Sequence, residues 1–329
     1  MFKKTIAWTL FILAVLPCLA FSSSYLLFLE AQGIAGYSTA VKKAIFFSMS
    51  QMEAMQKPSL GFDYVQRFSG ASGDFAVLAV QARLAVNADG DKTLEPQLYN
   101  AYLKIKTRSV DIWIGHNRPK FGLVSSLDTH AQLLQPLSMN GLGFDRDWGV
   151  GVEGDYAEGN AGISLTTGSG MPLYFKGNFF LSGRYSRGIL NQDNYNVGIS
   201  VGYGRILDVA GYHLMSETPM EFAGAGLDFS WLKNNLEHRV EFMAGTLDDQ
   251  GVFAIFWRTG IGLLEEGRLK LEAQPVIVFA RKKTQTQLSV GASYLATPDW
   301  TLRAMVQYDR DMKDVRFVIQ AYFYKGIRF

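Results

Sequence analysis

The sequence of 329 residues contains a single cysteine, Cys18, which lies in an apolar segment at the N-terminus. Once that segment is removed, no disulfide can stabilise the chain in an oxidising compartment. The predicted fold therefore depends on hydrogen bonds and on burial of apolar side chains. Lipidation of Cys18 is the alternative, and Pro17 argues against it because a small residue is expected at that position.

The sequence also lacks an excess of charge of either sign, with 32 Lys and Arg against 30 Asp and Glu. Removal of Lys3 and Lys4 with the N-terminal segment makes the two counts equal. No bulk electrostatic field would recruit nucleic acid, which we exclude as a partner.

Catalytic and metal-binding patterns are missing as well. The four histidines, His116, His130, His213 and His238, form no closely spaced pair, so we predict no metal site and no cofactor. Ser125 or Ser126 with Asp128 and His130 would be a nucleophile set, but they lie within a few residues on one predicted loop. We therefore predict no catalytic residues and a protein that is not an enzyme.

Long apolar runs are absent except at the start of the chain. Lys3 and Lys4 precede an apolar run over 5–19, and small residues follow, which is the layout of a secretory signal. We assign residues 1–24 to a signal peptide and residues 25–329 to one domain. No later run reaches the roughly eighteen residues of a membrane-spanning helix.

What the sequence does contain is a two-residue period, as in "DWGVGVEGDY" over 147–156. Apolar residues occupy every second position (one parity) and polar residues occupy the positions between them (the other parity). This alternation is typical of a strand with one face in contact with water. The pattern recurs from residue 75 to the end, in segments separated by turn residues. The predicted strands are 25–37, 59–68, 74–86, 97–107, 109–116, 146–156, 160–168, 178–187, 194–204, 221–232, 237–247, 251–264, 268–279, 285–295, 301–309 and 315–329.

Charged residues avoid the apolar parity of these strands. On the polar parity we expect seven lumen-facing residues: Arg83, Lys104, Asp147, Glu153, Arg184, Arg258 and Arg303. A soluble sandwich would also keep charges from its core. The even strand count, the aromatic residues near strand ends (Tyr99 and Trp148 among them) and the terminal Phe329 favour lipid over a core. The fold class is therefore all-β: a transmembrane antiparallel β-barrel of about 16 strands, within 14 to 18.

Two segments depart from the strand pattern. Val41, Ile45, Met49, Met52 and Met55 are three or four residues apart, which favours a short amphipathic helix within residues 38–58, as a loop on the rim or a partial plug. Pro275 interrupts a predicted strand, where we expect a bulge.

The longest interruption runs from Asn117 to Asp145. The stretch "DIWIGHNRPKFGLVSSLDTH" over 111–130, followed by Arg146 in "FDRDWGVGVEGDY", resembles the phosphate-selective porins O and P over Tyr99 to Gly170. The resemblance implies a third external loop that folds inward and narrows a pore, and a homotrimer. No dense run of lysines and arginines accompanies it, which argues against phosphate selectivity.

These observations predict a channel of the bacterial outer membrane for passive diffusion of small hydrophilic solutes, with membrane lipid as its surroundings. We place the pore constriction at Arg118, Lys120, Asp128, His130 and Arg146. Positive charges slightly outnumber negative charges at these positions, so we expect a mild preference for anions. The alternative is a barrel enzyme or adhesin whose activity lies in the external loops.

Deletion of Phe329 tests the predicted export route. A terminal aromatic on an amphipathic strand resembles the assembly signal of outer-membrane barrels. We expect the deletion to reduce the folded species that migrates differently on unboiled and boiled gels. Unchanged assembly would contradict the terminal-signal prediction.

Overall fold

The computed structural model describes residues 22–71, 73–88 and 94–327. Phe329 and all but the last three residues of the predicted signal lie outside these ranges. The first strand begins at Ser22, so Ser22, Ser23 and Ser24 pair with Ser69, Phe68 and Arg67. No helix in the described ranges is long and apolar enough to cross a membrane.

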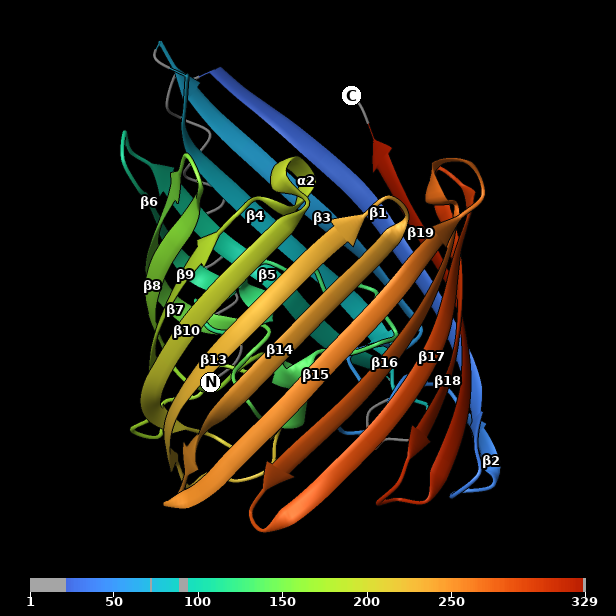
Figure 1. Cartoon of the computed structure of the whole chain (residues 1–329). Coiled ribbons are helices and arrows are strands. Elements are labelled where there is room, and N and C mark those ends of the chain that lie inside the picture. The colour runs from blue at the N-terminus through green and yellow to red at the C-terminus, as the bar shows by residue number, and fades with distance from the viewer. Residues whose placement is uncertain (1–21, 72, 89–93, 328–329) are drawn as a thin grey trace.

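The described chain forms a closed antiparallel barrel of 16 strands, as predicted (Figure 1). The strands are β1 (Ser22–Ser38), β3 (Ser59–Gly70), β4 (Gly73–Val86), β5 (Leu94–Lys106), β6 (Asp111–Asn117), β7 (Asp147–Tyr156), β8 (Gly159–Thr166), β9 (Phe179–Arg187), β10 (Tyr195–Ile206), β13 (Met220–Lys233), β14 (Leu236–Leu247), β15 (Gln250–Leu263), β16 (Leu269–Ala280), β17 (Lys283–Thr297), β18 (Trp300–Asp309) and β19 (Asp314–Ile327).

The barrel closes through β1, which pairs with β3 on one side and with the last strand, β19, on the other. The β1–β19 register runs from Leu27 opposite Ile327 to Ser38 opposite Arg316. Closure leaves no open sheet edge, so backbone N–H and C=O groups of every strand find partners without water.

Both described ends of the chain lie at one end of the barrel, with short connections such as the turn that contains α2 (Leu190–Asp193) (Figure 1). Longer connections lie at the opposite end, which carries the short strand β2 (Lys43–Ile45) and the hairpin of β11 (Val209–Ala210) and β12 (His213–Leu214). Short turns mark the periplasmic end of outer-membrane barrels, so we assign the loop-rich end as extracellular.

The two-residue period separates two surfaces, as β10 shows. Ile199, Val201 and Tyr203 are 56%, 59% and 57% exposed on the outer wall, whereas Ser200 between them is 1% exposed. An outer wall of exposed apolar side chains is stable only in lipid. The barrel is therefore a transmembrane barrel.

The helix expected within residues 38–58 is not present. These described residues form β2 and irregular loops, with Ile45, Met49 and Met55 buried and Val41 and Met52 exposed. The spacing of three or four residues therefore does not mark one face of a helix, because some of these five apolar side chains are buried and others are exposed.

Two strand details also differ from the prediction. Tyr99 is an extra residue in β5, between Leu98 and Asn100, which pair with Ala82 and Gln81. This bulge turns Tyr99 into the barrel rather than toward lipid. At Pro275 the β15–β16 pairing is interrupted but resumes in the same register, so no bulge forms there. Because Pro275 has no backbone N–H, it cannot donate to the hydrogen-bond ladder between β15 and β16, which explains the interruption.

Adjacent residues of β5 test the assignment of the two surfaces. Leu103 pairs with Leu78 and Ile114 on the lipid side, whereas Tyr102 lines an internal cavity. We expect Leu103→Lys to destabilise the barrel by about 2 to 4 kcal/mol and Tyr102→Lys to cost much less. Urea unfolding in lipid vesicles measures both. A greater loss in Tyr102→Lys would reverse the assignment of inside and outside.

A candidate channel constriction

The loop over 118–146 folds into the barrel and packs against its inner wall. Six of its buried apolar side chains belong to one cluster: Phe121, Leu123, Leu127, Leu137, Leu142 and Phe144. They contact inward-facing residues of β9 and β13–β16, namely Phe180, Phe222, Met243, Ala254, Phe256, Val276 and Val278. This part of the interior is therefore a hydrophobic core and contains no water-filled lumen.

Backbone groups of the loop bond to side chains of β8, β10 and β14. Lys120 N donates to Ser164 Oγ at 2.9 Å, Gly122 N to Ser200 Oγ at 3.1 Å, and Leu123 N to Glu241 Oε1 at 2.7 Å. Gly122 has φ of 68°, and a Cβ there would lie 2.3 Å from Glu241 Oε1, so glycine is required. The entry of the loop is thus held in one conformation.

The loop also contacts β15 and the strands β18, β19 and β1, where the barrel closes. Arg258 donates to Gln132 Oε1 at 2.7 Å and to the carbonyl of Leu134 at 2.6 Å. Leu133 and Leu134 are buried with Ile34 of β1 and Val318 of β19, and with Ile45 and Met305. The loop therefore crosses the barrel, as its length predicted.

Open space remains between this loop and β5–β9. Two cavities of about 280 Å³ and 170 Å³ share Lys120, Ser125 and Glu153 as lining residues. The larger is also lined by Asn100, Tyr102, Lys104, Asn117, Arg118 and Arg146, and the smaller by Asp155, Asn160, Ala161 and Arg184. The three shared residues lie between the two cavities, which we together call the polar passage.

Charged side chains of the barrel wall and of the loop form ion pairs in this passage. Lys104 from β5 and Lys120 from the loop each bond one oxygen of Glu153 on β7. Arg118 lies 2.7 Å from Asp128, whose side chain is 70% exposed. Burial lowers the pKa of the Lys120 ammonium, and the contact with Glu153 opposes that shift.

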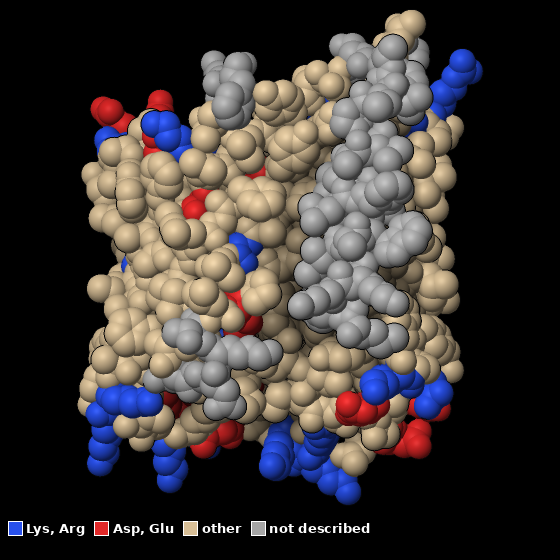
Figure 2. Space-filling model, turned by 180° about the vertical axis from the view of Figure 1, so that it is seen from behind, with Lys and Arg blue, Asp and Glu red and all other residues tan. Residues whose placement is uncertain are grey.

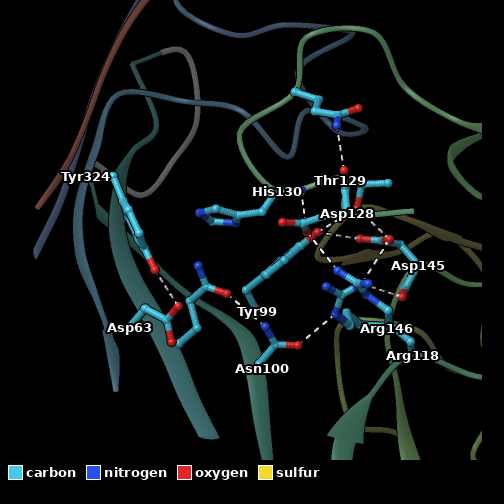
Figure 3. A network of polar contacts seen from close by, with 12 residues as sticks. Asp63, Tyr99, Asn100, Arg118, Asp128, Thr129, His130, Asp145, Arg146 and Tyr324 are labelled. Carbon is cyan, nitrogen blue, oxygen red and sulfur yellow. Dashed lines mark hydrogen bonds and ion pairs between the residues drawn. The ribbon is translucent and has the colours of Figure 1, made fainter. Parts of the chain in front are cut away.

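Arg146 is held from several sides (Figure 3). Its guanidinium lies 4.3 Å from the centre of the Tyr99 ring, bonds Asn100 Oδ1 at 2.8 Å, and lies 3.1 Å from Asp145 Oδ1. Tyr99 also bonds Thr129 and Asp145. The bulge that turns Tyr99 inward thus supplies the platform for Arg146.

Of the five residues expected at the constriction, the structure brings Arg118, Lys120 and Arg146 to one cavity. Asp128 is adjacent through its pair with Arg118. His130 lies outside the cavity lining and bonds Glu30 Oε2 at 2.8 Å, with its ring against Tyr99.

Of the seven residues expected to face the lumen, Lys104, Glu153 and Arg184 line the passage. Asp147 does not face water: its buried carboxylate accepts bonds from the amides of Trp148, Gly168, Ser169 and Gly170. Arg83 and Arg258 are buried and hold loops through the carbonyls of Met55 and Leu134. Arg303 bonds Gln320 and lies over Tyr322.

The sequence pattern did not reveal the uncharged residues of the passage, such as Asn100, Tyr102 and Asn160, because the lumen-facing positions were predicted from charge alone. It also missed the apolar residues that receive the loop. Their signal was present: Val276, Ile277, Val278 and Phe279 are apolar on both parities, which indicates burial on both faces.

Comparisons with known proteins support the fold. No protein-family model matches the sequence, and no curated protein matches it. Among solved structures, a loop L8 deletion mutant of OmpT, an outer membrane protein of Vibrio cholerae, has a TM-score of 0.63 at 12% identity, covering 92% of this chain and 99% of that one. An anion-selective porin from Comamonas acidovorans has 0.61 at 9% identity, covering 93% and 100%.

A third match is the outer membrane channel DcaP of Acinetobacter baumannii, with a TM-score of 0.55 at 11% identity, covering 92% of this chain and 98% of that chain. At these identities the likeness concerns the fold. The chain has a porin-like outer-membrane barrel.

Arg258 tests whether the loop is held as described. Arg258→Met removes donors to Gln132 and Leu134, and we expect it to loosen the loop by about 2 to 3 kcal/mol. Single-channel recordings should then show larger and more variable conductance. Arg239→Met is the matched control, since Arg239 bonds Glu237 on its own strand. Identical recordings from parent and Arg258→Met would contradict this anchoring.

Proposed function

We propose that this barrel is a passive diffusion channel for small hydrophilic solutes, with a mild preference for anions. The observation that carries the proposal is the inward-folded loop, which fills one side of the barrel and leaves a polar passage along β5–β9. A loop that only packed on the rim would not restrict a solute.

The preference for anions follows from the accessible charges. The residues that line the two cavities include five cations, Lys104, Arg118, Lys120, Arg146 and Arg184, against two acids, Glu153 and Asp155. In a narrow passage with low-dielectric walls, a small excess of positive charge attracts anions more strongly than in open water. Exposed Asp128 and Asp155 keep the preference mild.

The resemblance to the phosphate-selective porins O and P supports the same class of protein and suggests a homotrimer. We do not extend the proposal to phosphate selectivity, because each buried or half-buried cation of the passage already has an acidic partner: Glu153, Asp128, Asp145 or Asp228. A barrel enzyme or adhesin stays the alternative, and we propose that the chain is not an enzyme. Absence of conductance in planar bilayers would favour that alternative.

Two opposite changes test the proposal. Arg118→Glu with Lys120→Glu should move the reversal potential in a salt gradient toward cation selectivity. Glu153→Gln should move it toward anions, because it releases Lys104 and Lys120 from their shared partner. Conductance should persist in both variants.

Arg108→Glu with Lys233→Glu is the control, since it makes the same charge change on exposed periplasmic turns. The proposal fails if the two passage variants shift the reversal potential in the same direction. It also fails if neither variant differs from the control.

A further inference from the structure

The extracellular rim over β16–β19 and β1 carries a concentration of exposed cations. Three neighbouring turns contribute Arg281, Lys282 and Lys283, then Arg310 and Lys313, then Lys42 and Lys43. In Figure 2, where the extracellular end is at the bottom, Lys and Arg side chains extend below a wall of mostly uncharged residues. We call these seven residues the basic rim.

Two acidic residues of the same turns, Asp309 and Asp314, are buried and accept bonds from backbone and hydroxyl groups, whereas Asp311 is exposed and accepts a bond from the amide of Thr286. Asp314, which is 2% exposed, accepts bonds from Ser38 Oγ, Thr39 Oγ1 and the amide of Ala40. Asp309, also 2% exposed, accepts bonds from the amides of Asp311 and Met312. Arg281 lies 3.0 Å from Asp208, whereas among the described residues no ion pair joins Lys282, Lys283, Arg310 or Lys313 to a carboxylate.

The same bonds make the basic rim rigid. Asp314 ties the turn after β1 to the start of β19, and Thr286 of β17 bonds both Arg310 and Asp311 across to the β18–β19 turn. Strands lie about 4.8 Å apart, so the three turns spread their charges over roughly 20 to 25 Å. Such an array can contact several phosphates at once.

The position of the basic rim relative to lipid identifies its partner. On the membrane side of the basic rim, the outer wall exposes Phe279, Leu288, Tyr308, Phe317 and Tyr37. Cations just beyond an apolar belt lie at the level of the lipid headgroups. We infer that the basic rim binds the phosphate groups of phosphorylated lipids in the outer leaflet.

The inference does not depend on channel activity. The test measures lipid retained by the refolded full chain in neutral detergent, using native mass spectrometry during titration with diphosphorylated lipid A. Each cation near a charged surface contributes about fivefold to binding, so Lys282→Gln, Arg310→Gln and Lys313→Gln together should weaken binding roughly 100-fold. Lys106→Gln, Arg108→Gln and Lys233→Gln, on exposed periplasmic positions, should leave it unchanged.

A second arm uses the parent chain alone and therefore needs no folded variant. Lipid A stripped of both phosphates should bind roughly 100-fold more weakly than the phosphorylated form. Equal binding of the two lipids, equal loss in the periplasmic control, or full binding by the rim variant would each overturn the inference. Competition by inorganic phosphate at equal concentration would indicate a solute site and overturn it as well.

Discussion

Pairing of every backbone amide and carbonyl within the membrane is the constraint on which the rest of this structure depends. The pairing of β1 with both β3 and β19 satisfies it by closing the sheet on itself. Closure creates two faces that meet different surroundings, and the two-residue period then sorts apolar side chains to one face and polar side chains to the other. An open sheet of the same strands would expose two unpaired edges to lipid.

Within the closed wall, the loop over 118–146 determines which inward-facing residues contact water. Its apolar side chains complete a core with β9 and β13–β16, and its backbone amides use Ser164, Ser200 and Glu241 as acceptors. These wall residues are buried although they point into a barrel. The side along β5–β9 keeps a polar passage, and its charges come from both the wall and the loop.

Acidic residues have two different roles in the barrel. In the passage, Glu153 and Asp128 face cations and moderate their charge. At the extracellular end, Asp309 and Asp314 bond backbone amides and leave the cations of the basic rim exposed. A balanced total charge therefore conceals local excesses, because the distribution depends on whether each carboxylate meets an ammonium group or a backbone N–H.

The sequence by itself determined the sixteen strands, the sides they present, the turns that join them and the long loop, because alternation and turn residues are local properties. It did not reveal the bulge at Tyr99, where one extra residue reverses the parity, or the irregular course of residues 39–58. The burial of Ser200 and Arg258 was decided only by tertiary structure, since both contact loop residues far away in the chain. Parity tells which way a side chain points, but not whether water or another segment occupies the space it enters.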